Sequence, residues 1–153
     1  MKSEIRCAIE LRADESRQSP GRLRGTILET GRVASDRREV FTPGSVQWPS
    51  NGIRLLSEHR GRQVMRVQPV VDGSAIRIDA PLPDTSLGRE VAAEIRSGRK
   101  SGLSVEFYAT REERVSGVRE IQSALVDAAA VVESPAYVQA RAEIRQRRRR
   151  AWL

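Results

Sequence analysis

The stretch that decides the fold is SGLSVEFYATREERVSGVREIQSALVDAAAVV, residues 101–132. Apolar and polar side chains alternate from Leu103 to Thr110, which is the period-two pattern of a strand with one buried face. Gly117 interrupts the stretch, and Arg119 to Val132 returns as a second long strand that becomes increasingly apolar. The stretch therefore predicts a β-hairpin with two long strands.

Segments on the amino-terminal side add further strands. Apolar residues occupy every second position from Ile5 to Leu11, which again indicates a half-buried strand. Asp72-Gly73 is a favoured two-residue turn and predicts a hairpin around it. The remaining predicted strands are Leu23 to Thr30, Ile53 to Ser57, and the two hairpin strands Val64 to Val71 and Ser74 to Leu82.

One helix is predicted after residue 83. Residues 84–86 offer N-cap oxygens, and apolar residues recur every four positions from Leu87 to Ile95. Gly98 lies where a glycine commonly ends a helix, and the nearby cations of Arg96, Arg99 and Lys100 suit the negative end of the helix dipole.

A second helix is predicted to begin at Ser134-Pro135 and to run through Ile144 into the carboxyl-terminal tail. Six or seven short strands with two helices indicate a mainly β domain, built as a barrel or a curled sheet.

Composition excludes several classes of protein. A chain of 153 residues has room for one modest core, and no run of about 18 apolar residues is present to span a membrane. The first 15 residues mix charges among apolar positions, which is unlike a signal peptide. A single cysteine, Cys7, excludes an internal disulfide framework, and with a single histidine it excludes a Cys/His zinc site. Chemistry that needs an imidazole can use only His59.

Charge divides the chain into two parts. Residues 141–153 contain six arginines and one glutamate, whereas the preceding residues carry 21 basic and 19 acidic side chains. We therefore expect a nearly neutral domain over residues 1–140, followed by an Arg-rich tail over residues 141–153. A basic tail on a neutral body is not the pattern of a domain that binds nucleic acid throughout.

Three side chains could carry chemistry together. Ser104 lies in the alternating strand after Gly102, His59 follows an apolar strand, and Asp127 interrupts an apolar run in which an unpaired carboxylate is costly. An imidazole that takes the proton of a serine hydroxyl makes it a nucleophile, and a carboxylate can orient that imidazole. Cys7 could also serve as a nucleophile, but it lies on the apolar side of its strand, where cysteine is usually inert.

Four short motifs follow one another along the chain: FTPGSV at 41–46, LLSEH at 55–59, SGLSVEF at 101–107 and VDAAAVVESPA at 126–136. They contain a proline-glycine turn, a leucine-leucine-x-x-histidine motif, a glycine-leucine-serine strand, and an acidic residue upstream of a proline-alanine ending. In order and spacing they resemble the motifs of tailed-phage prohead proteases of the HK97 type. The resemblance covers residues 20–140.

This resemblance implies a serine endopeptidase that needs no cofactor or metal. The implied fold is a closed or curled β-barrel like that of herpesvirus assemblin, with about two flanking helices. Such enzymes act inside the assembling prohead in the cytoplasm of the bacterial host, remove scaffold or the scaffolding segment of the capsid protein, and often cleave themselves. Matched by position, Ser104 is the nucleophile, His59 is the general base, and Asp127 occupies the position of the family's acidic residue.

The third member of the triad is less clearly marked than the other two. Herpesvirus relatives use a second histidine, which this chain lacks, so the third member is acidic or missing. Glu106 competes with Asp127, because it shares the strand face of Ser104 two residues further on. Residues 128–130 are alanines where the family often has serine, and Glu58 stands where aspartate is more usual.

The backbone donors of an oxyanion hole are not marked by any motif. Gly102 and the loop Ser97 to Ser101 are the candidates.

Two other functions compete with the protease. One is a catalytically silent assembly or scaffold-binding protein of the same fold, and the other is a small nucleic-acid-binding protein that works through Arg145 to Arg150. The partners expected are the major capsid protein or its scaffolding segment, a second copy of the chain in a homodimer, and weak contacts of the tail with nucleic acid or an acidic scaffold. No membrane partner is expected.

Overall fold

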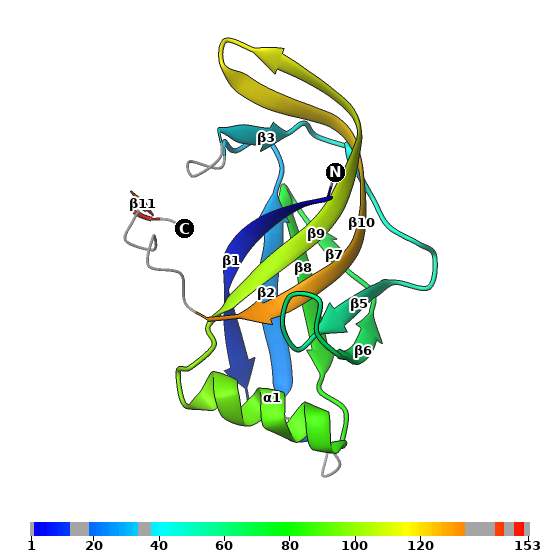
Figure 1. Cartoon of the computed structure of the whole chain (residues 1–153), viewed down its shortest axis with the longest axis vertical. Coiled ribbons are helices and arrows are strands. Elements are labelled where there is room, and N and C mark those ends of the chain that lie inside the picture. The colour runs from blue at the N-terminus through cyan, green and yellow to red at the C-terminus, as the bar shows by residue number, and fades with distance from the viewer. Residues whose placement is uncertain (1, 13–18, 34–37, 134–142, 146–148, 152–153) are drawn as a thin grey trace.

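A computed structural model of the chain describes residues 2–12, 19–33, 38–133, 143–145 and 149–151. Within these residues the fold is mainly β, with one helix (Figure 1). The elements in chain order are β1 (Lys2–Arg12), β2 (Arg22–Glu29), β3 (Glu39–Phe41), β4 (Val46–Gln47), β5 (Ile53–Leu56), β6 (Gln63–Val67), β7 (Val70–Asp72), β8 (Ala75–Pro81), α1 (Ser86–Arg96), β9 (Gly102–Val115), β10 (Val118–Val132), β11 (Glu143–Arg145) and β12 (Arg149–Ala151).

One sheet contains the strands from β1 to β10. Its order is β6-β5-β10-β9-β1-β2-β8-β7, and β3 and β4 also pair with β10. The strands β6 and β7 lie at opposite ends of this order, yet only Gln68 and Pro69 connect them. Because consecutive Cα atoms are 3.8 Å apart, Val67 and Val70 lie within about 11 Å of each other. The sheet must therefore curl until its ends nearly meet, as the sequence predicts.

The hairpin β9–β10 organises this sheet. One edge of β10 pairs with β9, and the other edge pairs in turn with three short parallel strands, β3, β4 and β5. The hairpin predicted around Gly117 is confirmed, since Val115 and Val118 are paired on either side of its turn. β10 is thus the strand that joins the parallel segments to the antiparallel part of the sheet.

The core fills the inside of the curl. Phe41 and Phe107 meet edge to face there, with ring centroids 4.9 Å apart. Helix α1 adds Val91 and Ala92 to the same core, and it lies at one end of the sheet, opposite the tip of the β9–β10 hairpin (Figure 1). Thr85 caps this helix by accepting a hydrogen bond from the Gly88 amide, as expected for its start.

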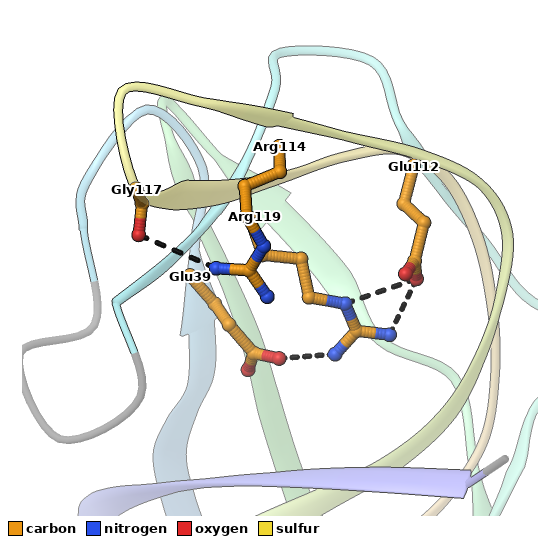
Figure 2. A network of polar contacts seen from close by, with 5 residues as sticks. All are labelled: Glu39, Glu112, Arg114, Gly117 and Arg119. Atoms are coloured by element: carbon orange, nitrogen blue, oxygen red, sulfur yellow. Dashed lines mark hydrogen bonds and ion pairs between the residues drawn. The ribbon is translucent and has the colours of Figure 1, made fainter.

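An ion-pair network fixes the β9–β10 hairpin beyond the core. Arg119 on β10 forms ion pairs with Glu39 on β3 and with Glu112 on β9 (Figure 2). The Nη2 atom of Arg119 is 2.5 Å from Oε2 of Glu112. The Arg114 guanidinium donates to the Gly117 carbonyl at the turn. Hydrogen bonding to Arg119 lowers the pKa of Glu112, and the pKa of Arg119 is raised, first of all by the same bond.

Two predicted strands differ from those observed. The predicted strand Val64 to Val71 is divided at Pro69, which has no amide proton to continue a ladder, so β6 pairs with β5 and β7 pairs with β8. The turn of the following hairpin is also shifted by one residue, because Asp72 pairs with Ala75 and leaves Gly73 and Ser74 between them.

The second predicted helix begins outside the described residues, at 134–142. Its predicted continuation through Ile144 is wrong, because Glu143–Arg145 is the strand β11. Within the described part of the chain, no helix is long and apolar enough to cross a membrane.

Candidate active site

The hairpin β9–β10 has two buried faces with different contents. On β9, Leu103, Val105 and Phe107 belong to the main core, so Ser104 and Glu106 face the other side of the sheet. Leu56 of β5 and three residues of β10 form a second, smaller cluster: Ala128, Ala130 and Val132. Ser104 and Glu106 therefore lie on the face with this small cluster, away from the main core.

A β-bulge at Asp127 produces this arrangement. Val126 is paired with Phe107 and Ala128 with Glu106, so Asp127 is an extra residue without a position in the ladder. Val126 faces the main core before the bulge and Ala129 faces it afterwards. The bulge thus turns Ala128 and Ala130 onto the face of Ser104 and Glu106.

His59 reaches this face from a tight turn between β5 and β6. The turn is closed by a hydrogen bond from the Gly61 amide to the Glu58 carbonyl and by another from Ser57 to Arg62. Arg60 adopts a left-handed conformation with φ of 58°. A Cβ atom at Gly61 would lie 2.9 Å from the Glu58 carbonyl oxygen, so the turn is closely packed. His59 is therefore held on a short, constrained segment.

The structure pairs His59 with Glu106. Nδ1 of His59 lies 2.9 Å from Oε2 of Glu106, and the two side chains are only 22% and 6% exposed. When the Glu106 carboxylate is ionised it can only accept a hydrogen bond, and Nδ1 of His59 is then the donor. In that tautomer Nε2, which is also buried, keeps a lone pair and can accept a proton.

Ser104 carries the hydroxyl of this face. Its side chain is fully buried, and among the described residues its Oγ has no hydrogen-bond partner. A buried hydroxyl without a partner is costly and calls for a functional or structural reason. The Oγ lies on the same face of β9 as Glu106, two residues away, where the imidazole of His59 also lies. The structure thus brings all three side chains to one face of the sheet.

Small residues on β10 make this meeting possible. β10 lies between β5 and β9, so the β5 and β9 backbones are about 10 Å apart and His59 must cross over β10 to reach Glu106. At the crossing, β10 presents Ala128 opposite Glu106 and Ala130 opposite Ser104. The small side chains of Ala128 and Ala130 therefore leave space for the imidazole on this face of β10.

Asp127, the predicted third member, has a different partner. Its carboxylate forms an ion pair with Arg54 of β5, with 3.1 Å between Oδ2 and Nη2. The bulge and this ion pair explain how a carboxylate is tolerated in an apolar strand. The contact that sequence reasoning assigned first to Asp127 is made in the structure by Glu106, its competitor.

The candidate oxyanion loop is occupied by its own hydrogen bonds. In this structure every amide of residues 97–101 already donates: the acceptors are the carbonyls of Ala93, Ile95, Glu94 and Val132, and the Ser97 hydroxyl for the amide of Arg99. The loop therefore offers no amide to an oxyanion in this conformation. Gly102, the other candidate from the sequence, is paired with Ala8 of β1 and with Val132 of β10.

Lys100 lies near the site, although the sequence predicted for it only a role at the end of the helix. The pattern placed it among the charges at the helix end, but its side chain is only 10% exposed and its Nζ donates to the Ser57 carbonyl at 2.6 Å. Glu94 of α1 lies 3.4 Å from the same nitrogen. Lys100 is one of only two lysines in an Arg-rich chain, and this rarity is the weak sequence signal that could have singled it out.

No described group of three or more His, Cys, Asp or Glu side chains is arranged to hold a metal ion.

Comparisons with known proteins bear on the fold and the family. No curated protein matches the chain significantly. Among solved structures, that of the bacteriophage T4 capsid assembly protease, gp21, matches with a TM-score of 0.54 and 11% sequence identity, covering 88% of this chain and 99% of that one. At this identity the match supports the curled β fold. The model of the family described as caudovirus prohead serine protease matches residues 8–152, nearly the whole chain. A serine and a histidine on one buried face agree with that description, and we conclude that the chain belongs to the family of caudovirus prohead serine proteases.

Proposed function

We propose that this protease cleaves peptide bonds with Ser104 as nucleophile, His59 as general base and Glu106 as the acid that orients the imidazole. The observation that carries the assignment of Glu106 is the 2.9 Å contact between Nδ1 of His59 and its carboxylate. Asp127 is the alternative acid, and its ion pair with Arg54 argues for a structural role.

The chemistry follows from the tautomer of His59. As Oγ of Ser104 attacks the carbonyl carbon of the substrate, Nε2 of His59 takes its proton, and the Glu106 carboxylate stabilises the imidazolium. The imidazolium then protonates the leaving amine, and a water molecule activated by the same base releases the acyl group. Within the described part of the chain, Oγ of Ser104 has no hydrogen-bond partner, as is common before substrate tightens a site.

We propose the major capsid protein, through a scaffolding segment, or a separate scaffold protein as the substrate. The family description and the likeness to a phage capsid assembly protease support a role in capsid maturation. The protease would act inside the prohead within the bacterial host, where it would also cleave itself.

The Arg-rich residues 141–153 are proposed to be a tail separate from the catalytic domain, residues 1–140. Its charge suits an acidic scaffold or, weakly, nucleic acid. We expect deletion of residues 145–153 to reduce incorporation into proheads while leaving cleavage of a short peptide unchanged. Unchanged incorporation and processing would contradict a targeting role. A second copy of the chain is the other proposed partner, and sedimentation of the full chain tests whether it forms a homodimer.

The deciding experiment is intact-mass spectrometry of the capsid protein co-expressed with this chain. We expect loss of a defined amino-terminal segment with the wild type and none with Ser104→Ala or His59→Ala. Assembled shells without cleavage by the wild type would contradict the protease and favour the silent assembly protein. Cleavage that persists with Ser104→Ala would show that another residue is the nucleophile.

A further inference from the structure

The turn that carries His59 is attached to the strand segment of Ser104 at two points. His59 contacts Glu106, which follows Ser104 by two residues. Ser57, at the start of the same turn, accepts a hydrogen bond from Lys100, which precedes Ser104 by four residues. The two attachments lie on either side of Ser104 along the chain. The turn is therefore held across the segment in which the nucleophile lies.

The attachment at Lys100 is a buried cation on a backbone carbonyl. Its 2.6 Å hydrogen bond to Ser57 is charge-assisted, and such bonds are shorter and stronger than neutral ones. Glu94 neutralises the ammonium from helix α1. A buried ammonium has a desolvation cost, so a lysine that served only the helix dipole would gain more from an exposed position.

The turn connects the contact between Lys100 and Ser57 to the position of the imidazole. The Ser57 amide donates to Arg62 while its carbonyl accepts from Lys100, so both sides of this peptide segment are fixed. Only Glu58 separates Ser57 from His59, and the hydrogen bond from Gly61 closes the turn around them. A shift of the Ser57 carbonyl must therefore move His59.

We propose that Lys100 is a positioning residue of the protease: by holding the Ser57 carbonyl, its ammonium sets the place of the His59 imidazole between Glu106 and Ser104. The inference rests on the proposed function of Ser104 and His59. Lys100 touches neither the substrate nor the reacting atoms, and it acts through the turn.

The test compares Lys100→Met with a matched control, Arg96→Met. Arg96 is also a long cation at the end of α1 and also donates to a backbone carbonyl, but that carbonyl belongs to Pro20. Since His59 is the only histidine, its ring nitrogens give unambiguous signals in ¹H–¹⁵N spectra of the full chain. Kinetics use a peptide that spans the cleavage site mapped in the co-expression experiment.

We expect Lys100→Met to change the ring shifts and tautomer ratio of His59 and to lower kcat about 10- to 100-fold with KM nearly unchanged, because a small misplacement of a catalytic group costs this much. Arg96→Met should change neither. If Lys100→Met does not fold, Lys100→Arg provides the same readouts, because it keeps the charge and moves the donor atom.

A folded Lys100 variant with wild-type His59 signals and wild-type kcat would overturn the proposal. The spectra decide it without any substrate, whereas the proposed function fails if the wild type does not cleave or if Ser104→Ala or His59→Ala still cleaves. The two failures are therefore distinguishable.

Discussion

Along the hairpin β9–β10, carboxylates of the sheet face different partners at two places. Near the body of the sheet, Glu106 faces the imidazole of His59. Toward the hairpin tip, Glu39 and Glu112 face the guanidinium of Arg119 (Figure 2). An imidazole can exchange a proton near neutral pH, whereas a guanidinium keeps its charge. The first place is suited to proton transfer, and the second is suited to fixing a strand.

This comparison also classifies Asp127. Its partner Arg54 is a guanidinium, so the ion pair resembles the network at the hairpin tip rather than the contact at His59. Partner chemistry, rather than position in a motif, is therefore the basis for preferring Glu106.

The largest expected effect separates the two acids. Glu106→Gln should lower the rate of peptide cleavage about 10³- to 10⁴-fold, because an amide no longer stabilises the imidazolium or its tautomer. Asp127→Asn should lower it less than about 10-fold, an effect of structure alone. Rates are measured on variants whose circular dichroism matches the wild type. The reverse order of effects would assign the orienting role to Asp127 and break the comparison.

The next largest effect concerns the space that Ala128 and Ala130 of β10 leave for His59. Ala130→Val adds two carbon atoms opposite Ser104, on the face that His59 shares with Glu106, and we expect an approximately 100-fold loss of activity from displacement of the proposed base. Ala128→Ser is the matched control, since it adds a single small atom, and it should stay within about threefold of the wild type. Activity is assayed on the cleavage-site peptide. Wild-type activity in Ala130→Val would show that His59 does not need this space.

At the hairpin tip the expected effect is on stability rather than on activity. Arg119→Met removes the cation beside Glu39, whose side chain is only 6% exposed, and leaves a buried carboxylate without that ion pair. We expect the free energy of unfolding to fall by about 3 kcal/mol, measured by urea unfolding. The cleavage rate of the folded variant should be unchanged. A selective loss of activity would mean that the two places are coupled.

The smallest expected effect is the pH dependence of the contribution that Glu112 makes to the free energy of unfolding. Its pKa in the folded protein lies below the ordinary value of 4.5, mainly because Arg119 donates a hydrogen bond to it. The stabilisation is therefore present above pH 4.5 and is lost as the pH falls through the lowered pKa. The side chain is 45% exposed, so solvent screening limits the contribution to about 0.5 kcal/mol.

The free energies of unfolding of Glu112→Gln and of the wild type, measured from pH 7 to pH 3, give this contribution. The difference between them should be constant above about pH 5 and should shrink on acidification. A difference that grows in acid would contradict the assigned sign.

Local patterns were sufficient for much of the fold. Alternation along residues 103–110 and the glycine at 117 gave the central hairpin, and the spacing of Leu87, Val91 and Ile95 gave α1. Pro69 carried the signal that divides β6 from β7, because a residue without an amide proton interrupts a ladder.

The site was harder to predict, because it depends on contacts between distant segments. The bulge at Asp127 reverses the alternation of β10. The sequence marks Asp127 as a carboxylate in an apolar run, but a carboxylate there indicates a need for a partner and does not by itself indicate a bulge. The contact between His59 and Glu106 joins residues 47 positions apart. Ser104 and His59 could be named from a family resemblance, but the acid depends on strand register, which spacing along the chain does not specify.

The position of β10 also has a consequence for the timing of synthesis. This strand is the last to be made among those of the large sheet, yet it lies between β5, which leads to the His59 turn, and β9, which holds Ser104. While the ribosome has not released residues 118–132, the histidine and the serine have no shared strand between them. The chain therefore cannot assemble the proposed proteolytic centre during most of its own translation, and activity of that centre must wait until β10 can join the sheet.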